Sequence, residues 1–136
     1  MEGRSPEPRW VSRLVAEAIH FDVLRSHGGM PGVRDEDALE SALARGRQRL
    51  AYEPASDLPE LAGAIGWGLT RNHPFNDGNK RVAFVVMAVF LGLNGLNIGA
   101  PETEVGTTML DVPAGSMSEA ELAEWLRASS KPCQPH

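Results

Sequence analysis

The chain has 136 residues, of which 42% are hydrophobic, and a formal net charge of −5 at pH 7. This length fits one domain, and the acidic charge argues against a direct nucleic-acid partner or a membrane-surface protein, because both present basic faces. The single cysteine, Cys133, allows no disulfide within the chain, so we expect a reducing, cytoplasmic setting. The longest apolar run, residues 82–91, is about half as long as a membrane span, which predicts no membrane association.

The first part of the chain predicts an arm, a helix and an irregular turn. Residues 1–9 carry no apolar pattern and are expected to form a flexible arm. Three glycines and a proline within residues 28–32 predict a short flap or hairpin near 26–33. The sequence leaves open whether this segment is a plain connection or a flap over a site. Between the arm and the turn, apolar residues recur at the spacing of one helix face; they are Val11, Leu14, Val15, Ala18 and Ile19.

Two further helices are marked by their capping residues. Asp35 is a favourable N-cap for a second helix, which Gly46 is expected to end. Asp57 and Glu60 have the spacing of a capping box for a third helix, which runs into residues 71–73. Because such caps satisfy backbone N–H groups that would otherwise lack a partner, they predict helix starts independently of the hydrophobic pattern.

The apolar run at residues 82–91 predicts the central helix of the fold. It is apolar on every side, which is typical of a helix that other helices surround. Its β-branched residues would also suit a buried strand, but the run is longer than a usual strand and shows no alternation. Asn94 and Gly95 end this helix, which spans about 79–94. We therefore predict an all-α helical bundle around it.

The last third of the chain predicts two more helices and a tail. A fifth helix is expected at residues 102–112, ended by the proline that follows it. Ser118 and Glu121 have capping-box spacing and mark the start of a sixth helix. Residues 130–136 are expected to form a disordered tail, so the predicted domain covers residues 10–129.

The strongest chemical signal is the segment 73–81, which reads His-Pro-Phe-Asn-Asp-Gly-Asn-Lys-Arg and leads into the buried helix. The N-terminus of a helix exposes unpaired N–H groups and the positive end of the helix dipole, so phosphates bind there readily. Gly78 lets a phosphate approach the backbone closely, and Asn79 offers a neutral side-chain donor. Lys80 adds a point charge and Arg81 a fork of donors that matches phosphate oxygens. Together they predict a cradle for a di- or triphosphate.

Three other residues of this segment complete the candidate site. Asp77 would repel phosphates unless a cation lies between them, and Mg²⁺ is commonly held by one or two carboxylates plus phosphate oxygens. His73 carries an imidazole that could take a proton from an attacking hydroxyl, and Phe75 is expected to anchor the loop in the core. Any one of these residues alone would more simply be structural. The full set provides what phosphoryl or nucleotidyl transfer requires, and predicts a phosphate-handling transferase.

The same segment resembles the signature of the Fic/Doc family, and Lys80 makes it similar to the Doc (death-on-curing) branch. Residues 28–35 and 39–45 also resemble the flap and the following helix of Doc-type proteins. The resemblance implies a Fic fold, with His73 as general base and Asp77 as the Mg²⁺ ligand. It further implies four residues that hold the nucleotide phosphates, namely Gly78, Asn79, Lys80 and Arg81.

The resemblance also implies an activity and a partner. Most Fic enzymes transfer AMP from ATP to a hydroxyl side chain and carry glycine where this chain has Lys80. The Doc branch implies instead a reversed nucleotide, so that the γ-phosphate of ATP is transferred to a threonine of elongation factor Tu and translation halts. Self-inhibiting relatives carry a helix with the pattern Ser/Thr-x-x-x-Glu-Gly/Asn, which this sequence lacks. A Phd-type antitoxin acting in trans is therefore implied, with a short amphipathic helix that binds in a groove.

Two alternatives to a Doc-like kinase stay open at the level of sequence. One is an AMP transferase with the same fold. The other is a non-catalytic protein that acts by binding an antitoxin and modulating the DNA binding of that antitoxin. The presence of both His73 and Asp77 favours a catalytic protein over the second alternative.

Overall fold

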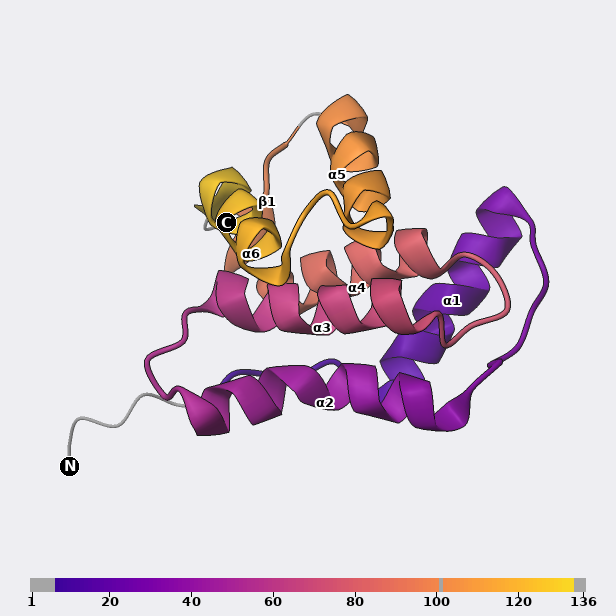
Figure 1. Ribbon diagram of the computed structural model, residues 1–136, viewed down its shortest axis with the longest axis horizontal. Coiled ribbons are helices and arrows are strands. Elements are labelled where there is room, and N and C mark those ends of the chain that lie inside the picture. The colour runs from indigo at the N-terminus through magenta and orange to yellow at the C-terminus, as the bar shows by residue number, and fades with distance from the viewer. Residues whose placement is uncertain (1–6, 101, 134–136) are drawn as a thin grey trace.

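The structure, a computed structural model, describes residues 7–100 and 102–133 (Figure 1). It is mostly helical, which confirms the predicted all-α fold class. In these residues, no helix has both the length and the apolar character that crossing a membrane requires. In chain order the elements are α1 (Arg13–His27), α2 (Glu36–Tyr52), α3 (Leu58–Asn72), α4 (Asn79–Leu93), β1 (Leu96–Ile98), α5 (Glu102–Ala114), α6 (Glu119–Ser129) and β2 (Ser130–Pro132).

The predicted capping residues occupy the starts of their helices. Asp35 precedes α2, and its Oδ1 accepts the N–H of Ala38 at 3.0 Å. At the start of α3, the Asp57 side chain accepts the Glu60 N–H at 3.0 Å, and the Glu60 side chain accepts the Asp57 N–H at 2.8 Å. The second predicted capping box is present at the start of α6. These helix starts are therefore confirmed.

Helix α3 lies at the centre of the bundle, with α2, α4 and α6 packed around it; Figure 1 shows it between α2 and α6. Its glycines permit this crowding. A Cβ added to Gly66 would lie 2.2 Å from Met87 Sδ of α4, and one added to Gly68 would lie 3.2 Å from Ala42 Cα of α2. The helix predicted at about 79–94 is present as α4, but the central position predicted for it is held by α3. More helices pack around α3 than around α4, because small residues let its neighbours approach closely.

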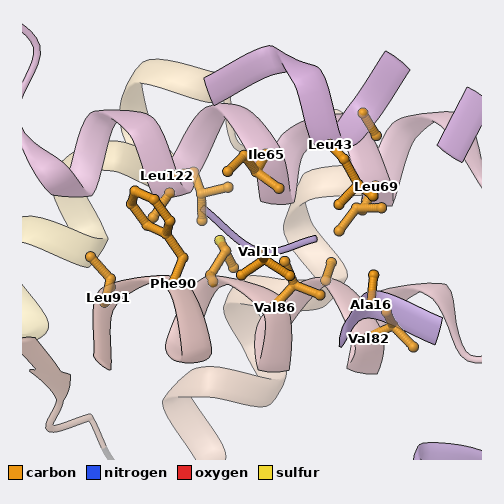
Figure 2. Close-up of a cluster of buried hydrophobic side chains, with 14 of the residues drawn as sticks. Val11, Ala16, Leu43, Ile65, Leu69, Val82, Val86, Phe90, Leu91 and Leu122 are labelled. Atoms are coloured by element: carbon orange, nitrogen blue, oxygen red, sulfur yellow. The ribbon is translucent and has the colours of Figure 1, made fainter. Parts of the chain in front are cut away.

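The hydrophobic core is concentrated where α3 faces α4. Figure 2 shows Ile65 and Leu69 of α3 opposite Val86 of α4, and all three are buried. Val11, which precedes α1, and Leu122 of α6 belong to the same cluster. The loop between α3 and α4 is thus mounted on two helices that the core holds rigidly.

Helix α1 turns a partly different face to the core from the predicted one. Leu14 and Val15, placed on the predicted inner face, are 80% and 40% exposed. The residues of α1 that are buried are Ala16, His20 and Val23. Of the other predicted residues, Val11 is buried and Ile19 packs against the core, whereas Ala18 is exposed. The prediction is therefore correct only in part, because the buried face also includes the polar residue His20. Its ring is in fact buried by contacts to the loop between α3 and α4.

Two helices continue beyond their predicted ends. Helix α2 passes through Gly46, where a Cβ would lie 2.7 Å from Trp10 Cζ3 and 2.9 Å from Ile65 Cδ1. This glycine therefore allows close packing and does not end the helix. Pro113 lies within the last turn of α5, where a missing N–H removes a single helical bond. Gly115, with φ of 82°, follows the true end of α5.

The described parts of the predicted arm and tail are both bonded to the body. The Arg9 N–H donates to Asn94 Oδ1 at 2.9 Å, and Asn94 Nδ2 donates to the Arg9 carbonyl at 3.0 Å. In the predicted tail, β2 pairs antiparallel with β1, and Asn97 lies opposite Lys131. The sequence did not reveal this pairing because three-residue strands are too short to show a period. Residues 1–6 and 134–136 lie outside the described residues.

Candidate active site

Residues 73–81, which we call the site loop, connect α3 to α4 through two left-handed residues. His73 ends α3 with φ of 48° and ψ of 58°, and Gly78 caps α4 with φ of 78° and ψ of 14°. Glycine adopts this conformation freely, whereas a residue with a side chain is destabilised by roughly 1–2 kcal/mol. Gly78 therefore suits its position, and His73 needs support from its surroundings.

Arg34 provides the support that His73 needs. Its Nε and Nη2 donate to the His73 carbonyl at 3.0 Å and 2.6 Å, and Nη2 also donates to the Asn72 carbonyl at 3.2 Å. These carbonyls lie at the C-terminal end of α3, where the helix leaves them without partners and the dipole favours a cation. The guanidinium group thus satisfies the helix end and holds the backbone of His73 in place.

The segment 28–35, which we call the flap, lies along the site loop and is bonded to it. The Asn76 N–H donates to the Gly32 carbonyl at 3.1 Å. Two residues earlier in the flap, the Met30 N–H donates to Asp77 Oδ2 at 2.7 Å. Because the flap pairs with the loop and not with itself, it is neither a hairpin nor a plain connection. The structure thus places this segment against the site loop, which is compatible with the flap that the sequence suggested.

Phe75 attaches the site loop to the core. Its side chain is 1% exposed and its ring stacks on His20, with centroids 4.1 Å apart and an interplanar angle of 18°. Its backbone is held by the Asn79 side chain, because the Phe75 N–H donates to Oδ1 and Nδ2 donates to the Phe75 carbonyl, both at 2.9 Å. Asn79, which the sequence suggested as a phosphate donor, is thus partly committed to holding the loop.

The N-terminus of α4 is open beside this clamp. The backbone N–H groups of Gly78, Asn79, Lys80 and Arg81 donate to no described residue, as expected in the first turn of a helix. The side chains of Lys80 and Arg81 are exposed and form no ion pair within the described part of the chain. Free N–H groups, the helix dipole and two cations together make this surface suited to phosphate.

His73 and Asp77 are exposed at the same loop. The His73 imidazole has no hydrogen-bond partner among the described residues, so both ring nitrogens are available to a ligand. Asp77 uses Oδ2 to accept the Met30 N–H and leaves Oδ1 free. Across the described ranges, no group of three or more His, Cys, Asp or Glu gathers to hold a metal. One free carboxylate oxygen fits a Mg²⁺ ion whose other ligands are phosphate oxygens and waters.

An apolar groove of about 470 Å³ adjoins the open N-terminus of α4. It lies between α1, α4 and α5, with Lys80 and Arg81 at its edge and Val23, Phe84 and Met109 in its lining. A larger hollow of about 1230 Å³ lies near the other end of α3, and no residue of the site loop lines it. The groove next to the cations is therefore the one that can extend the site.

Two residues that hold the site loop, His20 and Arg34, were not among those predicted from the sequence. His20 did carry a signal, because its spacing from Ala16 and Val23 places all three on one helix face. Arg34 carried none, since the carbonyls that it binds lie 38 and 39 residues later in the chain. Only folding brings these groups together.

Comparisons with known proteins agree with the resemblance seen in the site loop. Residues 10–91 match the Fic/DOC family. The chain is 32% identical over 110 residues to a "Protein kinase doc" of Escherichia phage P1, and the aligned region covers 81% of this chain and 86% of that protein. It is 36% identical over 88 residues to a "Toxin Doc" of Mycolicibacterium smegmatis, and this aligned region covers 64% of this chain and 63% of that protein. The chain therefore belongs to the Fic/DOC family, in its Doc branch.

Proposed function

We propose that this chain is a Doc-like toxin that transfers the γ-phosphate of ATP to a hydroxyl side chain of a protein target. The observation that carries the proposal is the open N-terminus of α4, whose free N–H groups share one loop with His73, Asp77 and Arg81. A relative named as a protein kinase supports the type of reaction. A second relative, named as a toxin, supports the biological role.

Each residue of the site loop has a proposed part in the transfer. The His73 imidazole takes the proton from the target hydroxyl as its oxygen forms a bond to the γ-phosphorus. The bond from that phosphorus to the bridging oxygen breaks, and ADP leaves. The N–H groups of α4 and the Arg81 guanidinium bind phosphate oxygens and stabilise their charge. The free Oδ1 of Asp77 would hold Mg²⁺, which neutralises phosphate charge when it is bound.

Lys80 is the residue on which the choice between kinase and AMP transferase rests. In the family resemblance, AMP transferases carry glycine at this position, whereas a lysine adds charge and crowds one phosphate subsite. The test uses ATP radiolabelled at either the γ- or the α-phosphate, with Mg²⁺ and the target protein. Transfer of the γ-label alone is expected. Transfer of the α-label would instead make the chain an AMP transferase. Lys80→Gly should weaken γ-transfer, and an unchanged product and rate would show that Lys80 does not define the reaction.

His73→Ala separates a catalytic toxin from a protein that acts only by binding. Loss of a general base should lower the transfer rate by about 10²–10⁴-fold and abolish toxicity in cells. The matched variant is Asn97→Ala, an exposed change on β1 that should leave both unchanged. If His73→Ala cells were arrested like the parent, the chain would act without catalysis, as a regulator that binds an antitoxin.

The proposed partner is a Phd-like antitoxin that acts in trans. An amphipathic helix is the kind of ligand that an apolar groove such as the one beside Lys80 and Arg81 accepts, and its presence there would hinder nucleotide binding. The proposed target is a threonine of elongation factor Tu in the cytoplasm, whose modification would halt translation. Mass spectrometry of that factor after reaction with the chain and Mg²⁺–ATP should locate a phosphothreonine. An unmodified factor would refute this target.

A further inference from the structure

His20 is a buried polar residue to which the proposed transfer assigns no part. It lies on α1, is 6% exposed, and contacts the site loop from the side of the core. Its Nε2 is 3.0 Å from the backbone carbonyl oxygen of Asp77. Its ring also stacks on Phe75, with centroids 4.1 Å apart. One side chain therefore touches both the anchor of the loop and the peptide at which α4 begins.

The hydrogen bond shows which ring nitrogen of His20 donates. A carbonyl oxygen only accepts, so Nε2 must carry the proton that it donates. The carbonyl belongs to the peptide that joins Asp77 to Gly78. In a planar trans peptide the N–H points opposite to the C=O. Holding the oxygen toward His20 therefore aims the Gly78 N–H away from α1, at the open end of α4 where no described residue accepts it.

We propose that His20 is a positioning residue, which donates through Nε2–H to the Asp77 carbonyl and thereby orients the Gly78 N–H toward a bound phosphate. It does not touch the reacting atoms. Its effect on catalysis rests on the proposed function, whereas its effect on the orientation of the peptide does not. The same bond restrains the backbone of Asp77, whose side chain is the candidate metal ligand.

The competing explanation is that His20 only fills space beneath the loop, and two substitutions separate the two roles. His20→Phe keeps an aromatic ring against Phe75 and removes the donor. His20→Gln keeps an N–H at a reach similar to Nε2 and removes the ring. A positioning role predicts that the glutamine variant is the more active, and a packing role predicts that the phenylalanine variant is. Phe21→Ala, on the same helix and 66% exposed in the parent, is the matched control and should behave as wild type.

Nuclear magnetic resonance tests the positioning without reference to activity. In the nitrogen spectrum of the histidine rings, Nε2 of His20 should carry a proton. The amide resonance of Gly78 should shift in His20→Phe, because the Asp77 carbonyl of the same peptide loses its hydrogen-bond donor. In His20→Gln, which keeps a donor, the resonance should return toward its wild-type position. Protonation at Nδ1 alone, or equal Gly78 shifts in both variants, would overturn the proposal.

Kinetics and nucleotide binding test the consequence for function. His20→Phe should lower kcat by about 10- to 100-fold, as small misplacements of a site do, and weaken Mg²⁺–ATP binding measured by calorimetry. His20→Gln should recover most of both. If the wild type neither binds Mg²⁺–ATP nor transfers phosphate, the proposed function fails, and the spectra still decide the role of His20. If the wild type is active and His20→Phe matches it, the positioning role is refuted.

Discussion

The clamp between Asn79 and Phe75 makes a sharp prediction about what shapes the site loop. The Asn79 amide makes two hydrogen bonds to the backbone of Phe75, one as acceptor and one as donor, both at 2.9 Å. Asn79→Ala removes both. It leaves the Phe75 side chain in its buried position, so the change isolates the backbone clamp from the hydrophobic anchor.

The size of the effect can be worked out from these two bonds. One intramolecular hydrogen bond contributes about 0.5–1.5 kcal/mol to stability, so the pair contributes about 1–3 kcal/mol. Both bonds are partly buried, and the Phe75 N–H and C=O that remain would lose partners that water only partly replaces. We therefore expect the free energy of unfolding to fall by about 2 kcal/mol. The loosened loop should also bind Mg²⁺–ATP more weakly.

Urea unfolding followed by circular dichroism measures the first quantity, and calorimetry with Mg²⁺–ATP measures the second. Asn97→Ala is the control, because this exposed asparagine on β1 has no side-chain hydrogen bond within the described residues. It should stay within about 0.5 kcal/mol of wild type. If Asn79→Ala lost nucleotide affinity with unchanged stability, Asn79 would act as a ligand donor, and the reasoning from the clamp would be refuted.

Gly68→Ala should lower the free energy of unfolding by about 1–3 kcal/mol, as overpacking does, because its Cβ would lie 3.2 Å from a backbone atom of α2. Arg34→Ala should lower stability by about 1 kcal/mol and the transfer rate by about tenfold or more, since the His73 carbonyl loses its donors. Hydrogen bonds from Arg127 hold the pKa of Asp57 below its usual value. The stability that this pair adds is therefore present above about pH 4 and is lost as the pH falls through the lower pKa of the folded state. Asp57→Asn should remove this dependence of stability on pH. The loss in the wild type should be less than about 1 kcal/mol, because both side chains are more than a third exposed.

Each of these expectations has its own control. Gly63→Ala, in the same helix as Gly68, places its Cβ 3.4 Å from Ala123, an ordinary contact, and should be neutral or stabilising. Equal losses at both glycines would rule out overpacking. The control for Arg34→Ala is Arg71→Ala, which removes another cation from the C-terminal end of α3, one that stacks on Trp67. If both variants lost the same amount of transfer rate, positive charge would matter and not the Arg34 hydrogen bonds. Parallel stability curves for Asp57→Asn and wild type below pH 4 would show that the Asp57 pair contributes nothing.

Local sequence was sufficient for most of the helices and for the content of the site loop. Helix starts could be predicted because a capping side chain bonds to backbone groups only three residues away, as Asp57 does with Glu60. The candidate site loop could be proposed from sequence because its candidate groups lie within nine consecutive residues, 73–81. The same holds for α4, whose apolar run needs no partner to be visible.

Two features depended on partners that are distant in sequence. Gly46 looked like a helix end, but Trp10 and Ile65 press against it and make it an internal glycine of α2. The buried face of α1 was predicted only in part because the burial of His20 depends on an acceptor 57 residues away. A local pattern reports which residues prefer to be buried, and says nothing of which other segment will bury them.

The sequence by itself determined the all-α class, most of the helix starts and the set of groups that can handle a phosphate. Only the tertiary structure decided how those groups are held. The flap, which includes Arg34, contacts the loop from the segment between α1 and α2, and His20 contacts it from α1. The physical reason is that helix caps and apolar faces are satisfied within a few residues, whereas His73 in its left-handed conformation needs donors that the packing of α1, α2 and α3 brings together.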